Sequence, residues 1–562
     1  MSYSIAFGLS ALLSFAPVVV GADESADLIL AGGKVVTLGA DGSDGQAIAV
    51  RDGRVLLVGT NAEVEARAGE STERIALDGA LVIPGFIEGH GHFLGIGDMK
   101  SQLDLTKAAS WEEIVALVAE AVKSAKPGEL IRGRGWHQSK WNVLPAGSVQ
   151  GLPRHDSLSA ISPENPVVLE HASGHATFAN AAAMKAAKID SATPDPDGGE
   201  IVRDEAGAPI GAFRERAAGL LMPVYAGAEG PDPLRLAQLA RDECLAKGIT
   251  SFHDAGSPLI VADLYRGMVE RDELGLRMFV MLSDSNERLS AMLPRHPLLA
   301  LESDQLKIGG IKRSIDGALG SHGAWLLEPY SDHGSSSGLN TLPIDSLVET
   351  ARLAALHQLQ LCVHAIGDRA NREVLDIFEA RFQAEPERTD YRWRIEHAQH
   401  LHPDDVPRFA ALSVIASMQA VHCTSDAAFV VDRLGEDRSR SGAYLWRTLT
   451  DHGVVVTNGT DAPVEDVDPI PNFYSAVTRI TKSGKPFFAD QRMTRLEALR
   501  AYTLNNAFAS FDEGVKGSLE PGKLADLTVL SRDIMTVPAE EIPGAEVLYT
   551  IVGGRVLYSR DE

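Results

Sequence analysis

The sequence predicts an α/β protein whose main part is a (β/α)8 TIM barrel, joined to a small β-sandwich domain that both chain ends form. Eight short apolar runs lie between residues 81 and 463, and helix-length segments separate most of them. Strands that alternate with helices form parallel sheets, and eight such units close a barrel. Short strand-like runs with tight turns fill both ends of the chain, which favours a separate sheet domain there.

Both ends of the chain show the same pattern of short strand-like runs joined by tight turns. Residues 27–77 contain LILAGGKVVTL and AIAVRDGRVLLVG, in which Asp52-Gly53 marks a hairpin turn. The C-terminal part contains KLADLTVLS and VLYTIVGGRVLYS, with Gly553-Gly554 as the turn. We therefore expect one β-sandwich domain made of residues 23–83 and 514–562.

The barrel is expected to span residues 84–513. About 150 residues separate its first two strands, far more than a crossover connection needs. Part of this insertion, about residues 128–230, is rich in Gly, Pro, Trp and His, and we expect it to form a lid over the carboxyl face. The eight expected strands cover residues 81–92, 248–256, 276–283, 305–317, 359–368, 393–400, 413–423 and 453–463.

Composition describes an ordinary soluble globular protein and excludes some partners. Of 562 residues, 44% are hydrophobic and 23% are charged. The formal net charge of -25 argues against nucleic acid, because binding to phosphate backbones needs clustered Lys and Arg. The three cysteines are too few and too scattered for a disulfide framework.

An apolar segment near the start predicts export. It runs from Ile5 to Val20, and its 16 residues are too few for a comfortable membrane span. Small residues follow it, which is typical of a secretory signal peptide. We expect residues 1–22 to be cleaved near Ala22, giving a periplasmic or secreted protein without stable membrane insertion. Residues 1–4 carry no Lys or Arg, so an uncleaved apolar N-terminus is the alternative.

Side chains that bind metals occur where the expected strands end. His90 and His92 are two apart, and such residues on a strand point to the same face. In a barrel, functional residues gather at the carboxyl ends of the strands. Imidazole and carboxylate groups are the ligands that divalent transition ions prefer. The further candidates are Lys312, His364, His397 and Asp461.

Lys312 needs a separate argument, because a protonated ammonium group has no lone pair for a metal. A buried lysine beside cations can lose its proton. The neutral amine could then add carbon dioxide, and the two oxygens of the resulting carbamate could bridge two metal ions. The alternative is an ordinary ion pair between Lys312 and Asp316 or another acid.

The motifs together resemble those of a known family. The chain is similar to the amidohydrolase superfamily, and within it to the amidohydrolase-3 branch of YtcJ-like metal-dependent hydrolases, which includes N-substituted formamide deformylases. The resemblance runs from about Asp27 to Tyr558. The stretches that carry it are VIPGFIEGHGHF, GRGWHQSKW, SGHATFANAAA, IKRSIDGALGSHGAWLLEPYSD, VHAIGDRAN, RIEHAQ, TNGTDAPV and GSLEPGKLADLTVL.

The resemblance implies a site with two metal ions, for which zinc is the expected metal. One ion would be held by His90, His92 and Asp461, the other by His364 and His397, with carboxylated Lys312 as the bridge. A divalent ion lowers the pKa of bound water and so supplies hydroxide. Asp461 would take the proton and pass it to the leaving nitrogen.

The implied reaction is hydrolysis of a non-peptide carbon–nitrogen bond, such as that of an amide, N-acyl or N-formyl compound. The partner is then a small amide-like molecule, and the sequence leaves homo-oligomerisation open. Five residues are candidates for substrate binding: Trp136, His137 and Trp141 in the expected lid, His175 in the family-like HASGHATFAN stretch, and His322 after the fourth strand. The alternative for the aromatic residues is the core of the lid.

Two other functions stay open at this stage. Mononuclear aminohydrolases (deaminases) of the same superfamily carry a glutamate three residues after the histidine of strand five, where this chain has Gly367. That difference disfavours deamination. The other alternative is a metal-free binding protein on a hydrolase fold, because a fold does not fix a function.

Overall fold

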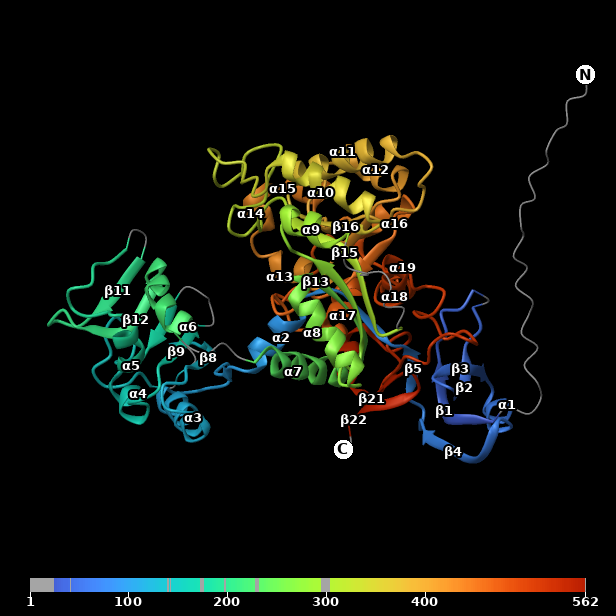
Figure 1. Cartoon of the computed structure of the whole chain (residues 1–562), viewed down its shortest axis with the longest axis horizontal. Coiled ribbons are helices and arrows are strands. Elements are labelled where there is room, and N and C mark those ends of the chain that lie inside the picture. Colours follow the sequence, from blue (N-terminus) through green and yellow to red (C-terminus); the bar gives the residue numbers. More distant parts are fainter. Residues whose placement is uncertain are drawn as a thin grey trace, which may run out of the picture.

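The computed structural model describes residues 25–40, 42–138, 141, 143–171, 176–196, 199–227, 232–294 and 304–560. The expected signal peptide and His175 lie outside these ranges. The described strands form three sheets, one from both chain ends, one in the barrel and one in the long insertion. In Figure 1 the barrel lies in the middle, with the terminal sheet on one side and the insertion on the other.

The eight barrel strands all pair in parallel, in the order β19-β18-β17-β16-β15-β14-β13-β6. Each overlaps one of the eight expected runs, so the predicted barrel is confirmed. The strands are β6 (Phe86–Gly91), β13 (Ile249–Ser257), β14 (Arg277–Leu282), β15 (Leu306–Ser314), β16 (Gln360–Ala365), β17 (Arg394–His397), β18 (Ile415–Met418) and β19 (Val456–Asn458).

The barrel is nearly closed between its first and last strands. The amide of Asp461 donates to the carbonyl of His90 at 2.8 Å, and the amide of His92 donates to the carbonyl of Ala462 at 2.7 Å. The side-chain amide of Asn506 donates to the carbonyls of Ile87 and Asn458. These bonds draw the ends of β6 and β19 together at the carboxyl face.

The barrel strands are apolar in sequence because both of their faces are buried. All six residues of β14 (RMFVML) and all four of β18 (IASM) are buried. Strands of a parallel sheet that is covered on both faces lose the alternation of polar and apolar residues. Polar residues inside such strands therefore stand out, and in β17 (RIEH) three of the four residues are of this kind.

Helices cover the barrel strands. α7 begins with Asp232, whose carboxylate accepts from the amide of Leu234, and with Pro233 at its first position. A capping box between Thr494 and Glu497 begins α18. The helices are α7 (Pro233–Ala246), α8 (Leu259–Glu270), α9 (Asn286–Met292), α10 (Ile344–Leu356), α11 (Asp368–Ala384), α12 (Val406–Ala411), α13 (Ala420–Asp426), α14 (Val430–Leu434), α15 (Glu436–Gly442), α16 (Trp446–Asp451), α17 (Pro469–Thr478), α18 (Arg495–Ala501) and α19 (Leu504–Ala509). Short 3-10 helices are η3 (Pro403–Asp405), η4 (Ala489–Gln491) and η5 (Ala539–Gly544).

Both chain ends meet in one sheet, as the sequence predicts. β5 of the N-terminal part pairs antiparallel with β20 of the C-terminal part. The two expected hairpin turns are present, and both of their central residues have positive φ. The strands are β1 (Ala26–Val35), β2 (Gly45–Arg51), β3 (Arg54–Gly59), β4 (Ala68–Ala76), β5 (Leu81–Pro84), β20 (Leu527–Leu530), β21 (Val547–Val552) and β22 (Arg555–Ser559), with α1 (Asn61–Glu65) after β3.

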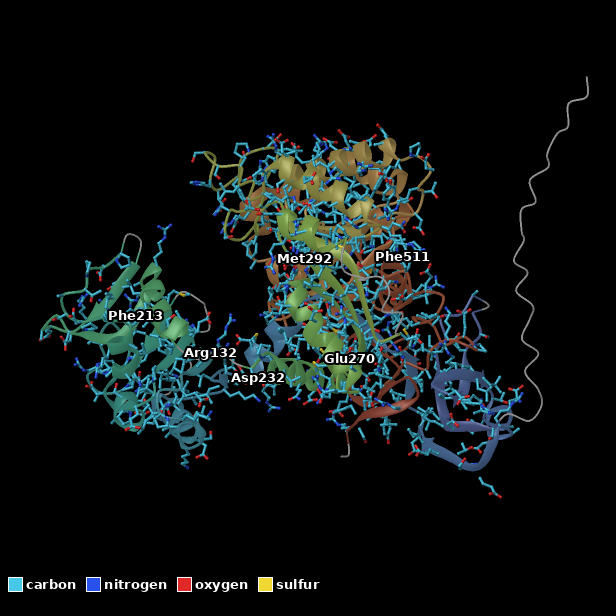
Figure 2. The ribbon with its side chains drawn as sticks, viewed as in Figure 1. Arg132, Phe213, Asp232, Glu270, Met292 and Phe511 are labelled. Atoms are coloured by element: carbon cyan, nitrogen blue, oxygen red, sulfur yellow. The ribbon has the colours of Figure 1, made fainter. Side chains whose placement is uncertain are left out.

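The insertion between β6 and β13 has a sheet and a core of its own. Its strands follow the order β11-β12-β10-β9-β8-β7. Figure 2 shows Phe213 within it and Arg132 on the side that faces the barrel. Its strands are β7 (Leu103–Asp104), β8 (Ile131–Trp136), β9 (Val167–His171), β10 (Ala176–Ala179), β11 (Gly199–Arg203) and β12 (Pro209–Glu215), and the helices of this part of the chain are α2 (Phe93–Lys100), α3 (Trp111–Ser124), α4 (Asp156–Ile161), α5 (Ala181–Ala186), η2 (Arg216–Leu221) and α6 (Met222–Gly227).

A cavity of about 310 Å³ lies where the insertion meets the barrel. Its walls come from α2, from β8 and β9, from Tyr225 and from Pro463, two residues after Asp461. An ion pair between Arg132 of β8 and Asp98 of α2 joins the two parts there. Within the described ranges, no helix is both long and apolar enough to cross a membrane.

Candidate active site

The six residues that the sequence singled out as metal ligands meet at the carboxyl end of the barrel. His90 lies in β6, Lys312 in β15, His364 in β16 and His397 in β17. His92 is the residue before α2, and Asp461 follows β19 by three residues. Six residues from five strand ends thus converge, although they are spread over some 370 positions of the chain.

The tightest group consists of His90, His397 and Asp461, whose ligand atoms lie within 4.8 Å of one another. The remaining three candidates adjoin this group. His92 Nε2 is 3.2 Å from Asp461 Oδ1, and Lys312 Nζ is 3.3 Å from His90 Nε2. The ring centroid of His364 is 4.4 Å from that of His397. The six side chains therefore form one continuous cluster.

The donor set fits a divalent metal ion. Asp461 Oδ1 and His364 Nε2 are buried and have no hydrogen-bond partner among the described residues. Buried polar atoms are almost always paired, so two unpaired ones in a cluster of ligand-type groups indicate that an ion belongs there. Imidazole nitrogen and carboxylate oxygen suit zinc and related transition ions.

Burial and neighbouring charges keep these groups in the form that binds a cation. Burial, together with Lys312 and His90, lowers the pKa of His364 to about 3. Burial and the neighbouring His364 and His90 also hold the pKa of His397 well below its usual value. At Asp461, burial raises the pKa, but the close approach of His90 and His92 to its Oδ1 outweighs burial, so the pKa lies well below its usual value. At neutral pH the two histidines are neutral and the aspartate is ionised.

Lys312 lies beside His90 instead of pairing with an acid. Burial lowers the pKa of Lys312, although Glu396 and Asp461 act in the opposite direction. No carboxylate of the described residues lies within ion-pair distance of its Nζ. Asp316, the partner considered from the sequence, instead accepts from the amides of Ile366, Gly367 and Trp325.

The backbone is strained at two of the candidate ligands. His397 and Ala398 have φ of 74° and 43°, and Asp461 has φ of 59°. Non-glycine residues rarely adopt the left-handed region, and such strain often marks functional sites. At the end of β17 this turn brings two consecutive residues to one side. Glu396 is hydrogen-bonded to His90, and the ring centroid of His397 is 4.7 Å from that of His90.

The comparisons agree with this geometry. Residues 73–558 match the model of the Amidohydrolase family. The chain belongs to the amidohydrolase family. Putative amidohydrolase YtcJ of Bacillus subtilis is 30% identical over 94% of this chain and 99% of its own length. N-substituted formamide deformylase of Arthrobacter pascens is 30% identical over 95% of this chain and 98% of its own. The resemblance read from the motifs is therefore confirmed.

A solved structure supports the same fold. The crystal structure of an uncharacterized metal-dependent hydrolase from Pyrococcus furiosus matches with a TM-score of 0.73 and 28% identity, and covers 91% of this chain and 100% of its own. The protein is thus an amidohydrolase-superfamily enzyme, a metal-dependent hydrolase of the class that acts on carbon–nitrogen bonds.

The amidohydrolase has further buried groups around the cluster that the sequence reading missed. Glu396 Oε2 lies 2.5 Å from His90 Nδ1, and Gln419 Oε1 lies 2.7 Å from His397 Nδ1. Gln419 also donates from its Nε2 to the carbonyl of Ser417, which fixes the orientation of its amide. Both histidines therefore engage Nδ1 and leave Nε2 for the centre of the cluster. The signal that was available is the presence of polar residues within strands that are otherwise apolar.

Glu88 ties the first strand of the amidohydrolase to its last. Its carboxylate accepts from the amides of His90 and Thr460 and from the hydroxyl of Thr460. Burial nonetheless raises the pKa of Glu88 to about 8. This side chain supports the backbone on either side of the cluster without reaching its centre.

The structure places four of the five candidate substrate contacts. Trp136 and Trp141 are buried in the core of the insertion, where Trp136 Nε1 donates to the carbonyl of Leu169. The ring of His137 packs against that of His171, with 4.4 Å between centroids. His322 Nε2 lies 3.1 Å from a carboxylate oxygen of Asp332 in the loop after β15. His175 lies outside the described residues, and substrate binding by these five residues stays a prediction.

Proposed function

We propose that this amidohydrolase hydrolyses the non-peptide carbon–nitrogen bond of a small amide-like substrate, such as an N-acyl or N-formyl amine. The observation that carries the proposal is the position of Asp461, whose Oδ1 lies 3.5 Å from His90 Nε2 and 3.2 Å from His92 Nε2. Water adds to the carbonyl carbon, the carbon–nitrogen bond breaks, and the products are a carboxylic acid and an amine.

Two divalent ions, most suitably zinc, would be held by the cluster. His90, His92 and Asp461 would hold one ion, His364 and His397 the other, and carboxylated Lys312 would bridge them. When bound, the ions acidify a water molecule and polarise the scissile carbonyl. Burial lowers the pKa of Lys312, which supports carboxylation, because only the neutral amine can add carbon dioxide.

Asp461 is the proposed proton carrier. Its carboxylate, kept ionised by His90 and His92, accepts a proton from the attacking water. It then delivers that proton to the leaving nitrogen, so that the amine departs in its neutral form. A group that first accepts and then donates this proton must reach both the attacking water and the leaving nitrogen. Asp461 Oδ1 is suited to this role because it lies beside two candidate metal ligands, where the water would be bound.

The structure around Gly367 favours this proposal over a mononuclear deaminase. A Cβ atom at this position would lie 2.1 Å from the carbonyl oxygen of Trp325. The glutamate that deaminases carry here therefore has no room in this chain. The name of the Arthrobacter pascens relative, N-substituted formamide deformylase, supports N-formyl compounds as the first substrates to test.

The test is a screen of N-formyl and N-acyl amines with zinc-loaded protein and detection of the released amine. We expect turnover of at least one N-formyl or N-acyl compound and its loss in Asp461→Asn. Release of ammonia from amino-heterocycles with no cleavage of any amide would instead identify the deaminase alternative.

We also propose that the insertion forms one wall of the substrate pocket. The 310 Å³ cavity between α2 and the insertion includes Pro463, next to the loop of Asp461, and Arg134 of β8. Arg134 is 3.9 Å from Glu170, a loose ion pair that leaves it able to contact a substrate. We expect Arg134→Ala to raise KM several-fold with little change in kcat. An unchanged KM for every substrate that the enzyme cleaves would separate this cavity from the substrate path.

Export is the final part of the proposal, and it rests on the apolar segment from Ile5 to Val20 and the small residues behind it. Sequencing of the N-terminus of the native protein tests it. We expect a mature chain that begins near Asp23, whereas an intact Met1 in a cytoplasmic fraction would refute export.

A further inference from the structure

An ion pair lies completely buried inside the barrel, directly beneath the ligand cluster. Arg394 and Glu396 are two apart on β17, so both side chains point to the same face of the strand. Neither residue has any exposed surface. Arg394 Nε is 2.8 Å from Glu396 Oε1. Buried charges occur in proteins when they are paired, so this pair needs a reason to be here.

The second oxygen of Glu396 contacts a candidate metal ligand. Glu396 Oε2 lies 2.5 Å from His90 Nδ1. An ionised carboxylate only accepts hydrogen bonds, so the proton must reside on His90 Nδ1. The lone pair of a neutral His90 is then on Nε2. That atom is 3.3 Å from Lys312 Nζ and 3.5 Å from Asp461 Oδ1, on the side where the other candidate ligands lie.

Arg394 reaches across the barrel and holds the carboxylate in place. Its guanidinium donates to Cys362 Sγ at 3.4 Å and to Met281 Sδ at 3.1 Å, and Nη1 lies 3.3 Å from His253 Nδ1. All three contacts are to uncharged groups on β16, β14 and β13. Glu396 is therefore the only anion within ion-pair distance of Arg394 in the described part of the chain.

We propose that Glu396 is the positioning residue for His90, and that Arg394 holds the Glu396 side chain against His90 Nδ1 so that His90 Nε2 faces the metal ions. This inference rests on the proposed function, in which His90 is a metal ligand. Hydrogen bonds from ligand histidines to carboxylates fix the ring tautomer and raise the basicity of the ligand, and their loss typically weakens metal binding 10–100-fold. The pair thus has a chemical role beyond filling the barrel.

The main variant is Glu396→Gln, measured on the metal-free protein by zinc competition with a chromophoric chelator. A carboxamide can either accept from or donate to His90 Nδ1, so it no longer fixes the tautomer. We expect the zinc affinity of the site to fall about 10–100-fold. Because Glu396→Gln leaves Arg394 without a partner, a second variant, Arg394→Met with Glu396→Gln, removes both charges. It should fold and show the same loss of affinity.

The chain offers a matched control at a second buried ion pair. Arg277 Nε, at the start of β14, lies 2.6 Å from Asp526 Oδ2, one residue before β20 of the terminal sheet, and both side chains are 6% exposed. Asp526→Asn makes the same kind of change without touching the ligand cluster. We expect it to lower stability while the zinc affinity stays as in the wild type.

Nitrogen NMR of histidine-labelled, metal-free protein supplies a readout that does not depend on metal or activity. We expect His90, assigned by the His90→Asn variant, to carry its proton on Nδ1 in the wild type and to show mixed tautomers in Glu396→Gln. A wild-type His90 protonated on Nε2, or equal zinc affinity in all variants, would overturn the positioning role alone. Wild-type protein that binds no zinc would overturn the proposed function, and with it the role of Glu396, whatever the tautomer.

Discussion

Replacement of Asp461 by Asn exchanges one carboxylate oxygen for an amide nitrogen and so tests whether Asp461 is the general base. Asn retains the shape of the side chain but cannot act as a base at neutral pH, and it is a poorer metal ligand than a carboxylate. The fold should survive, because the amide of Asp461 still donates to the carbonyl of His90. The φ of 59° at this residue is also tolerated, since Asn adopts the left-handed region more readily than most residues.

The expected size of the effect follows from the contacts of Asp461. Loss of the general base alone should lower kcat about 10²–10⁴-fold, which corresponds to about 3–5 kcal/mol in the activation free energy. The side chain also adjoins His90 and His92, so weaker metal binding should add to the loss. The kinetic assay must therefore be paired with elemental analysis of the same sample.

Asp526→Asn serves here too as the control, because it makes the same chemical change far from the cluster and should leave kcat unaltered. The reasoning is refuted if Asp461→Asn keeps both metal ions and hydrolyses amides at a near-normal rate. If the metal is lost and saturating zinc restores full activity, Asp461 is a ligand and not the base.

Three further predictions follow from other parts of the site. Elemental analysis should find close to two metal ions per chain, and Lys312→Ala should lose at least one of them; a firm value of one that is insensitive to this change would favour a mononuclear site. His400 is buried with both ring nitrogens unpartnered among the described residues, and burial lowers its pKa to about 3. Between these two pH values His400 is protonated in the unfolded chain but neutral in the folded protein. The free energy of unfolding should therefore fall as the pH drops from about 6.5 towards 3, by at most about 1.4 kcal/mol per pH unit. Urea unfolding of the metal-free protein should show a shallower dependence in His400→Phe, and an identical slope would contradict this. Gly367→Ala should cost about 1–3 kcal/mol of stability because its Cβ would clash with the Trp325 carbonyl. Gly334→Ala, where nothing lies within 4 Å, should change little, and equal effects of both in thermal unfolding would count against the clash.

The barrel could be predicted from the sequence because its signals are local. Most barrel strands, with β15 as an exception, bury nearly all of their residues, so they appear as apolar runs with helix-length segments between them. The candidate ligands could be recognised for the same reason. His90, His364 and His397 each lie at or next to the end of such a run, and the carboxyl ends of parallel strands meet at one face whatever the details of packing.

The aromatic residues of the insertion could not be assigned to a pocket or to a core from the local sequence. Trp136 and Trp141 lie in a stretch that suits either a pocket wall or a core. The structure packs Trp141 against Trp111 and Trp136 against Phe178, in the core of a sheet whose first and last strands in the chain, β7 and β12, are more than 100 residues apart. Only the pairing of those strands decides which side of the sheet an aromatic residue packs on.

The sequence by itself thus determined the barrel, the joining of both chain ends in one sheet, and the set of metal-binding residue types at the strand ends. Periodicity and strand-end position suffice for these features. Only the tertiary structure decided which nitrogen of His90 carries its proton, because Glu396 is 306 positions away in the chain. It also decided that Lys312 adjoins His90 and not Asp316. Hydrogen-bond partners depend on distances of a few tenths of an ångström between strands, and no spacing within one strand contains that information.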